Sequence, residues 1–380
     1  MNTVEKKPRT KREPLVYITK RSDLSPKKAL LVRSAVIFGG ILCCAIVILL
    51  LTGANPFNVF GAIVYGSFGA PVKIWNLLQD TAILLGISVA VTPAFKMRFW
   101  NTGAEGQVLV GMLASAACAF YLKDSLSPAL TIIIMLVSST LAGAIWALIP
   151  GFFKAIWNTN ETLFTLMMNY VAAQLVSVLL LTWNPMKGTY PGPDIISKNG
   201  WLPTIFGKKQ LIIILIVVII TALAYIYLKR SKQGYEISVV GESENTARYI
   251  GINVKKTIIR TVLISGALCG IMGWLMFSGN AHAIKTDSVG GNGFTAIMVS
   301  WMSKFNPIIM VFSSLLVCFL QKGTGQITSV LGPGASNVGS ILTGIMILSV
   351  VASEFFVSYN VHFRHKAEKN DKEVAKNVND

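Results

Sequence analysis

The sequence is dominated by long apolar runs that follow one another along most of the chain. The run Leu211–Leu228 consists mainly of Leu, Ile and Val, with Thr221 as its polar residue. A helix that spans a membrane needs about 20 predominantly apolar residues, and the longer runs reach this length. They do not alternate between apolar and polar residues, as the strands of an outer-membrane barrel do. The pattern predicts an all-α polytopic membrane protein.

Composition sets the expected number of spans. Hydrophobic residues make up 53% of the 380 residues and charged residues only 13%, whereas about 25% of the residues of soluble proteins are charged. About 200 apolar residues suffice for roughly ten spans. This composition excludes a soluble enzyme, a secreted disulfide scaffold and a disordered chain. The five cysteines lie in apolar runs without zinc or disulfide spacing, which is typical of packing residues.

We predict about ten transmembrane helices. Phe294–Met302 is too short to span alone, and Gly290, Gly291 and Gly293 beside it predict a broken or tilted helix. Asn55–Lys73 is amphipathic and rich in glycine, and is expected to lie in the outer interface or to enter the membrane and return. The ten segments are Ser34–Thr52, Leu77–Phe95, Gln107–Leu122, Ala129–Ile149, Leu163–Thr182, Leu211–Leu228, Thr257–Gly279, Phe294–Met302, Pro307–Leu320 and Ser340–Tyr359.

The distribution of charge predicts the orientation. Basic residues outnumber acidic residues by 34 to 17, a net charge of +17, and ten of the basic residues lie in the first 33 positions. Cytoplasmic segments of membrane proteins are enriched in Lys and Arg, so we expect both termini to be cytoplasmic. Anionic membrane lipid, and not nucleic acid, is the expected partner of this charge. The predicted organisation is a basic tail (1–33), a transmembrane domain (34–359) containing a cytoplasmic loop (229–256), and a charged tail (360–380).

The chain lacks the motifs of the common energised or catalytic sites. It has no G-x-x-x-x-G-K-[ST] phosphate loop, no H-E-x-x-H and no G-x-S-x-G. Its three histidines do not pair with carboxylates or cysteines at metal spacing. We therefore expect no catalytic residue, no metal site and no cofactor in this chain.

The predicted spans contain polar residues but few acidic ones. Asp80, Glu105 and Glu354 lie near or within them. A secondary carrier coupled to protons or sodium usually needs ionisable residues inside its spans, and this class remains an alternative. The uncharged polar groups suit a neutral polar solute, or they form hydrogen bonds between helices. They belong to Ser139, Thr140, Asn169, Gln174, Ser265 and Asn292.

Glycines in the later part of the chain predict close helix packing. Gly266 and Gly270 form a G-x-x-x-G pattern, and Gly273 follows them. Such patterns let helix backbones approach one another in membranes.

The cytoplasmic loop 229–256 is long and varied in composition. One or two helical turns are predicted near its middle, with acidic residues toward the start and a basic residue toward the end, as suits the helix dipole. Gly241 is expected to break the chain before this helix and Gly251 to cap its end, with Ile252 as the apolar contact. A helix that docks another protein and a plain amphipathic linker both fit this pattern. The charged residues concerned are Glu242, Glu244 and Arg248.

Three motifs resemble those of one family. Val240–Val254 has the pattern V-G-E-x-x-x-x-A-R-Y-x-G-I-N-V, Phe99–Gln107 reads F-W-N-T-G-A-E-G-Q, and Asn160–Tyr170 reads N-E-T-L-F-T-L-M-M-N-Y. Taken together, in their order along the chain, they resemble the motifs of the ABC importer permeases of the simple-sugar, nucleoside and branched-chain amino-acid systems. The resemblance covers roughly residues 30 to 355. Trp100, at a position that varies in the family, and the long basic tail depart from the pattern.

The resemblance implies a division of labour. The chain would be one of two permease subunits, identical or paralogous, of a multi-pass importer in the cytoplasmic membrane. Separate ATP-binding subunits would hydrolyse ATP with Mg²⁺, and an extracytoplasmic lipoprotein would deliver the solute. The motifs most resemble the nucleoside-type permeases, with ribose- or galactose-type sugar permeases as the alternative. The residues that would couple to the ATP-binding subunits are Gly241, Glu242, Glu244, Ala247, Arg248 and Gly251.

Polar residues of the motifs Phe99–Gln107 and Asn160–Tyr170 suggest a second functional region. Gly103 and Gly106 let the backbone turn tightly at the start of the third predicted span. Polar side chains nearby are expected to line or brace the inner half of the translocation pathway. These residues are Asn101, Glu105, Gln107, Glu161 and Asn169.

Overall fold

The computed structural model describes residues 16–21, 25–122, 125–183, 198–327 and 336–363. Most of the predicted basic tail and of the predicted charged C-terminal tail lies outside these ranges, as do residues 184–197. The chain forms two compact units: Met1–Pro56 together with Ile341–Asp380, and Phe57–Ser340.

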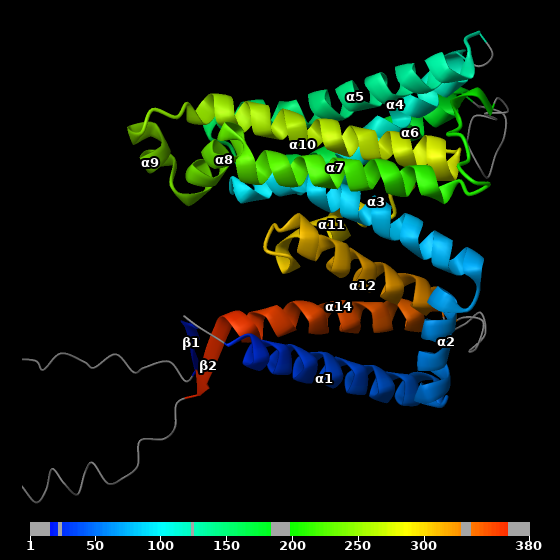
Figure 1. The fold of residues 1–380 in the computed structure, drawn as a ribbon, viewed down its shortest axis with the longest axis vertical. Helices are drawn as coiled ribbons and strands as arrows, with labels where there is room; N and C mark the ends of the chain where they lie inside the picture. Colours follow the sequence, from blue (N-terminus) through cyan, green and yellow to red (C-terminus); the bar gives the residue numbers. More distant parts are fainter. Residues whose placement is uncertain (1–15, 22–24, 123–124, 184–197, 328–335, 364–380) are drawn as a thin grey trace, which may run out of the picture. The chain divides into compact units, whose positions relative to one another are not determined.

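The predicted all-α fold is confirmed, because all ten predicted segments are helices (Figure 1). Eight of the described helices are long and apolar enough to cross a membrane. The other two of the ten are α11, which has eleven residues, and α12, in which the apolar helix Pro307–Gly323 is shorter than the eight. The ten helices are α1 (Pro26–Thr52), α3 (Pro71–Lys96), α4 (Ala104–Leu122), α5 (Pro128–Trp157), α6 (Glu161–Trp183), α7 (Gln210–Arg230), α10 (Val254–Met276), α11 (Asn292–Met302), α12 (Pro307–Gly325) and α14 (Ser336–Ser358).

Local sequence explains several helix ends. Pro71 begins α3 and Pro128 begins α5, at positions where the missing N–H of proline would have had no partner within the helix. At the other end of α5, Asn158 adopts the left-handed conformation with φ 53°, which asparagine tolerates better than most residues.

The core of the larger unit is the packing of α10 against α4 and α5 through glycines. A Cβ at Gly270 would overlap the carbonyl group of Ser139 in α5, and a Cβ at Gly111 would lie 2.7 Å from the Cα of Gly270. A Cβ at Gly266 would overlap the carbonyl oxygen of Gly143. The close packing predicted from the G-x-x-x-G pattern is therefore observed.

Helix α3 lies deep in the larger unit, because nearly every residue from Leu77 to Phe95 is buried. Two of its buried hydroxyls bond carbonyls of the helix itself: the Ser88 hydroxyl donates to the Leu84 oxygen and the Thr92 hydroxyl to the Ser88 oxygen, each at 2.7 Å. The hydroxyl of Ser300 in α11 donates to the Ser88 oxygen at 2.8 Å, which fastens α11 to α3.

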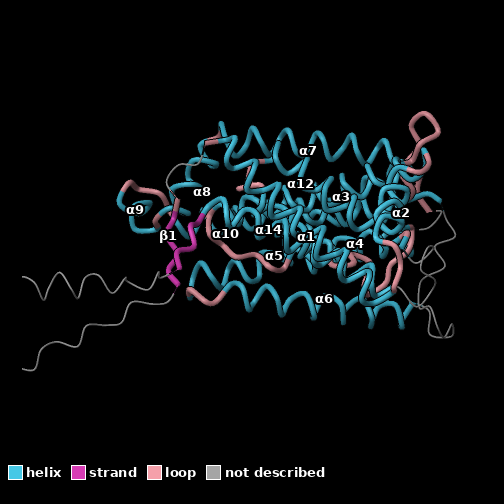
Figure 2. The backbone as a smooth tube through the Cα atoms, turned by 90° about the horizontal axis from the view of Figure 1, so that it is seen from below, coloured by secondary structure: helices cyan, strands magenta, loops and turns pink. Residues whose placement is uncertain are grey.

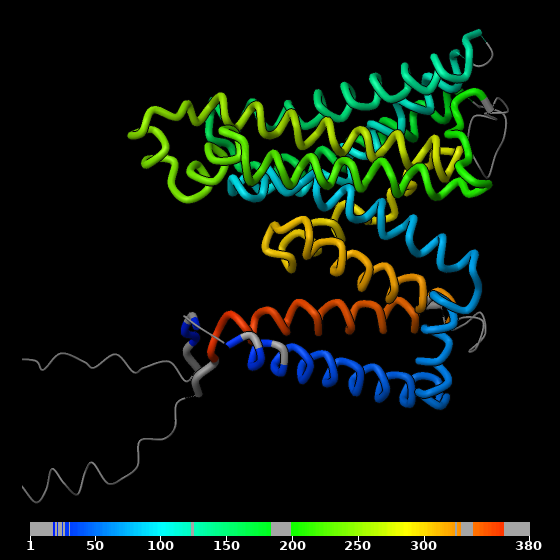
Figure 3. The backbone as a smooth tube through the Cα atoms, viewed as in Figure 1, coloured from blue at the N-terminus to red at the C-terminus, as the bar shows by residue number. Residues whose placement is uncertain are grey.

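Helix α11 begins inside the bundle, as the predicted broken helix requires. After α10 the chain forms a π-helical turn, η2 (Phe277–Ala281), and then returns to α11 through Gly290 and Gly291, whose φ angles are 63° and 78°. Figure 3 shows this return along the larger unit. The eleven residues of α11 are too few to cross a bilayer.

The segment Asn55–Lys73, for which the sequence left two arrangements open, contains the helix α2 (Pro56–Phe68). It packs on α12: the Ser67 hydroxyl donates to the Phe319 oxygen at 3.1 Å, and a Cβ at Gly66 would lie 3.2 Å from the Cα of Gly323.

The smaller unit pairs the two ends of the chain. Strand β1 (Val16–Lys20) runs antiparallel to β2 (Tyr359–Phe363), shown as the strand pair in Figure 2. The Arg33 guanidinium of α1 forms an ion pair with Glu354 of α14 at 2.7 Å. Neither strand was predicted from the sequence.

The loop 229–256 forms two short helices, α8 (Lys232–Glu242) and α9 (Glu244–Tyr249). They lie beyond the ends of α7 and α10 in both Figure 1 and Figure 2. Arg260 of α10 fastens α8 through an ion pair with Glu236 at 2.7 Å.

Candidate functional site

Helix α9 is defined by capping interactions at both ends. The Ser243 hydroxyl accepts a hydrogen bond from the Thr246 N–H at 3.3 Å. At the other end Gly251 has φ 84°, and the Ile252 N–H donates to the Ala247 oxygen at 2.9 Å. This pattern ends a helix with a left-handed glycine. The predicted short helix and its glycine cap are confirmed.

The predicted role of Gly241 is wrong. Gly241 lies within α8 and is buried, and a Cβ there would overlap the carbonyl oxygen of Lys96 at the end of α3. It allows close packing of two backbones, while the chain breaks at Ser243, whose side chain caps α9. Glu242 is the last residue of α8 and not the first residue of the next helix.

One side of α9 is anchored and the other is uncovered. Ala247 is fully buried in an apolar cluster with Met97, Phe99 and Val254. Tyr249, by contrast, is 93% exposed, and the adjacent Ile250 is 51% exposed. The Glu244 carboxylate accepts from the Arg248 guanidinium at 3.2 Å on this outer surface. The helix is thus held firmly while it presents an aromatic and an aliphatic side chain outward.

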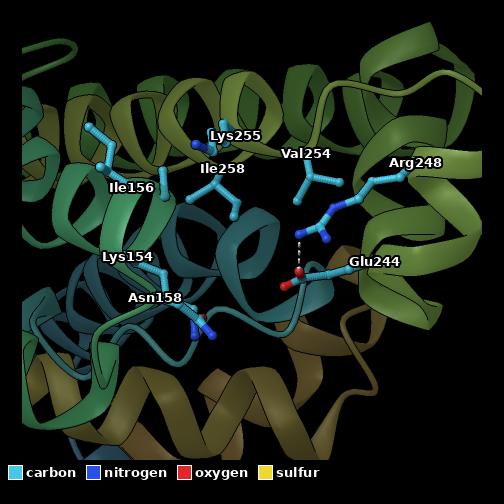
Figure 4. A pocket seen from close by; sticks show the side chains of 9 residues that line it. Lys154, Ile156, Asn158, Glu244, Arg248, Val254, Lys255 and Ile258 are labelled. Carbon is cyan, nitrogen blue, oxygen red and sulfur yellow. Dashed lines mark hydrogen bonds and ion pairs between the residues drawn. The ribbon is translucent and has the colours of Figure 1, made fainter.

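A pocket with a volume of about 160 Å³ lies beside α9, and we call it the α9 pocket (Figure 4). Residues from the end of α5, from α9 and from the start of α10 line it. Its buried apolar lining residues include Ala155, Val254 and Ile258. The complete lining is Lys154, Ala155, Ile156, Asn158, Glu244, Arg248, Val254, Lys255 and Ile258.

The second predicted region centres on the start of α4. Asn101 and Gln107 are buried and exchange two hydrogen bonds: the Asn101 Nδ2 donates to the Gln107 Oε1 at 3.2 Å, and the Gln107 Nε2 donates to the Asn101 Oδ1 at 3.0 Å. The Asn101 Oδ1 also accepts from the Gly103 N–H at 3.1 Å. These bonds fix the turn that leads into α4.

Asn169 joins α6 to this turn. Its Oδ1 accepts from the Gly106 N–H at 2.8 Å, and its Nδ2 donates to the Thr102 oxygen at 2.9 Å. Gly106 is needed for this approach, because a Cβ there would lie 2.8 Å from the Asn169 Oδ1. The Thr102 hydroxyl lies 3.0 Å from that of Thr165 in α6, a second contact that sequence reasoning missed.

Glu105 points to a different partner. Its Oε1 accepts from the Gly291 N–H at 2.8 Å and its Oε2 from the Gly293 N–H at 2.7 Å. It thereby satisfies backbone donors at the start of α11 and places a negative charge at the positive end of that helix. A Cβ at Gly273 of α10 would overlap the Val108 oxygen, so the first turns of α4 pack against α10. The contact between Glu105 and the start of α11 therefore lies within the helix bundle.

The five predicted residues therefore occupy three neighbouring contacts. Asn101, Gln107 and Asn169 form the joint between α4 and α6, and Glu105 joins α4 to α11. Glu161 accepts from Lys154 at 2.9 Å and joins α6 to the end of α5. The described residues contain no group of three or more His, Cys, Asp or Glu side chains that could hold a metal ion.

Comparison with known proteins decides the family. Residues 73–351 match the family described as the permease component of branched-chain amino acid transport systems. The chain belongs to this permease family. It is accordingly a membrane translocation subunit and not an enzyme, and a multi-pass protein of the cell membrane.

Several relatives resemble the permease over most of its length. It is 26% identical over 359 residues to the glucose ABC transporter permease protein TsgB13 of Haloferax volcanii, which covers 90% of this chain and 91% of that protein. It is 27% identical to the nucleoside ABC transporter permease protein NupB of Lactococcus lactis, covering 87% and 91%. It is 27% identical to the guanosine ABC transporter permease protein NupP of Bacillus subtilis, covering 84% and 92%. The family implies an ATPase partner and a solute-binding protein.

Proposed function

We propose that this permease translocates nucleosides across the cytoplasmic membrane into the cell. Separate ATP-binding subunits supply the energy by hydrolysing ATP with Mg²⁺, and an extracytoplasmic lipoprotein delivers the solute. A second permease subunit, identical or paralogous, completes the pathway. Both termini of the chain lie in the cytoplasm in this arrangement, where the basic tails face anionic lipid.

The observation that carries the choice of nucleosides is the similarity to NupB and NupP over 84% or more of the chain. The polar residues of the bundle fit such a solute, because amide and hydroxyl groups predominate among its buried polar side chains. Simple sugars are the second candidate. The similarity to a glucose permease at 26% identity, and to the fructose import permease protein FrcC of Rhizobium meliloti at 25%, favours them.

Uptake of radiolabelled uridine and ribose, in cells with and without the gene, tests the solute. Loss of uridine uptake on deletion, in an activity for which unlabelled purine and pyrimidine nucleosides compete, is the expected result. Loss of ribose uptake with intact uridine uptake would make the permease a sugar importer and leave its architecture unchanged.

Coupling to the ATP-binding subunits is assigned to α9 with its flanking residues. This assignment is supported by the outward-facing Tyr249 and Ile250 on a helix that is otherwise anchored at Ala247. An exposed aromatic and aliphatic pair at the end of a cytoplasmic helix suits a protein contact.

The double variant Glu244→Arg with Arg248→Glu tests this assignment. It keeps the ion pair within α9 but reverses the order of the two charges on the surface. Co-purification of the ATP-binding subunit with the permease should be lost. Intact co-purification and full uptake would contradict the assignment.

The polar contacts at the start of α4, made by Asn101, Glu105, Gln107 and Asn169, are proposed to brace or line the inner half of the pathway. Asn169 of α6 accepts from the Gly106 N–H of α4, and Glu105 of α4 accepts from the Gly293 N–H of α11. These two side chains therefore tie three helices together. Alanine substitution of Asn169 should lower uptake several-fold, since Asn169 bonds both Thr102 and Gly106. Unchanged uptake by a fully assembled variant would contradict this role.

A further inference from the structure

The α9 pocket is formed jointly by α9, the end of α5 and the start of α10. Figure 4 shows Lys154 and Asn158 on one side and the Glu244–Arg248 pair on the other, with Lys255 and Ile258 above. At about 160 Å³ it has room for about five water molecules. That space accommodates one side chain, and not a helix.

The charges that line the α9 pocket are unbalanced. Lys154 is held by Glu161 at 2.9 Å, and Arg248 is held by Glu244 at 3.2 Å. Lys255 forms no side-chain hydrogen bond or ion pair with any residue that the structure describes, and it is exposed. Its ammonium group is therefore the cation available to an incoming group. An anion in the pocket would lie against the buried apolar residues Val254 and Ile258, where charge pairing is strengthened.

The surroundings of the pocket favour a protein as the source of that anion. Glu244 and Arg248 of α9 line the pocket, and the two residues that follow Arg248 in the chain, Tyr249 and Ile250, are both exposed. A protein that docks on α9 would therefore meet exposed apolar side chains as well as residues of the pocket lining. An exposed aromatic side chain beside charged groups is typical of a protein interface.

We propose that the α9 pocket receives an acidic side chain of the ATP-binding subunit, with Lys255 as its ion-pair partner and Asn158 as a hydrogen-bond donor beside it. The inference rests on the proposed function, and it adds the chemistry of the contact. The charge pair fixes the register of the docked subunit on α9, since a pocket for one side chain admits one alignment.

Lys255→Glu tests the inference, with Lys256→Glu as the matched control. Both lysines are exposed and lie in the first turn of α10, but only Lys255 lines the pocket. A carboxylate is favourable at this end of a helix, so neither change should lower the stability of the permease. The ATP-binding subunit that co-purifies with the unaltered full-length permease is identified by mass spectrometry, and its affinity for each variant in lipid nanodiscs is measured by biolayer interferometry.

Lys255→Glu should weaken this affinity by at least about tenfold, and Lys256→Glu by less than about twofold, because a reversed contact charge repels its partner whereas a neighbouring charge is screened. A photo-crosslinker in place of Ile156, which also lines the pocket, should label a peptide of the subunit that contains an acidic residue. Replacing that acidic residue by Lys should restore the binding of Lys255→Glu.

Equal affinities of the two variants would overturn the inference and leave the proposed function in place. Loss of co-purified anionic lipid from Lys255→Glu, with unchanged affinity for the subunit, would also overturn it and assign the pocket to a headgroup. If no ATP-binding subunit co-purifies with the unaltered permease, the proposed function itself fails.

Discussion

Glu105 links two helices that are distant in the sequence, and both of its carboxylate oxygens are used. They accept from Gly291 at 2.8 Å and from Gly293 at 2.7 Å. Because α11 starts within the bundle, no water replaces these bonds at low cost. A residue that the sequence suggested for the pathway thus also completes the start of a broken helix.

Glu105→Ala should lower the thermal stability of the solubilised permease, because it leaves two backbone donors without partners at about 1–3 kcal/mol each. Glu105→Gln keeps one acceptor oxygen, and its loss of stability should be about half that of Glu105→Ala. Thermal unfolding followed by size-exclusion chromatography measures both. An alanine variant as stable as the unaltered protein would show that these two bonds contribute nothing.

Gly293→Ala should be destabilising for a steric reason. Its new Cβ would lie 2.7 Å from the Glu105 Cα and 2.8 Å from the Glu105 Oε2. Gly61→Ala in α2 is the matched control, because a Cβ there meets nothing within 4 Å. The control should be neutral or stabilising by up to about 1 kcal/mol, as alanine is favoured over glycine in a helix. Equal stability of the two variants in the same assay would contradict the close contact.

Sequence reasoning found the polar residues at this scale but not their partners. Asn101, Glu105, Gln107 and Asn169 stand out as polar residues beside or within apolar runs. Glu105 and Gly293 are 188 positions apart, and no local pattern relates them. Glu161 shows the same limit, since nothing in its motif indicates a bond to Lys154.

At the scale of elements, α9 is short and depends on its caps. Six residues make only about one and a half helical turns, which are not stable alone. The helix is therefore stabilised by its caps at Ser243 and Gly251 and by the burial of Ala247. The sequence predicted this helix because its caps are local. It misplaced Gly241, because the need for glycine there arises from the carbonyl of Lys96 in a distant helix.

Gly251→Ala should loosen α9 without unfolding the bundle. Alanine at φ 84° costs about 1–2 kcal/mol. Hydrogen exchange over residues 244–252 should speed up several-fold, while the thermal unfolding temperature of the permease changes little. Unchanged exchange would show that the glycine cap does not hold the helix.

Tyr249→Ala should weaken association with the ATP-binding subunit about tenfold or more, since a buried aromatic anchor at an interface contributes about 2 kcal/mol or more. The free permease should keep its stability, because Tyr249 is 93% exposed. Tyr170→Ala in α6, which alters a tyrosine that is 64% exposed, is the control and should leave association unchanged. Equal effects of the two variants would remove Tyr249 from the contact.

Helix α11 and the strand pair show two degrees of predictability. The length of Phe294–Met302 and its flanking glycines predicted a broken helix, because a bilayer sets a minimum length for a span. The strands β1 and β2 gave no such signal. Each has five residues, and they lie at opposite ends of the chain, so only their pairing defines them.

At the scale of the whole molecule, membrane physics made most of the fold predictable. Ten apolar segments became ten helices, since a lipid environment leaves an apolar segment little choice but helix. The division into two units and the helix α8 were not visible in hydropathy, because both depend on contacts between distant segments. The solute was not predictable either, since uncharged polar side chains suit nucleosides and sugars equally.

We propose that this permease moves nucleosides only when an ATP-binding subunit engages α9. Uridine uptake in cells lacking the gene, complemented with the unaltered chain or with the Glu244→Arg and Arg248→Glu variant, tests it most directly. The unaltered chain should restore uptake, and the variant, present in the membrane at the same level, should not. Equal uridine uptake by both complemented strains, or uptake that never depended on the gene, would contradict the claim.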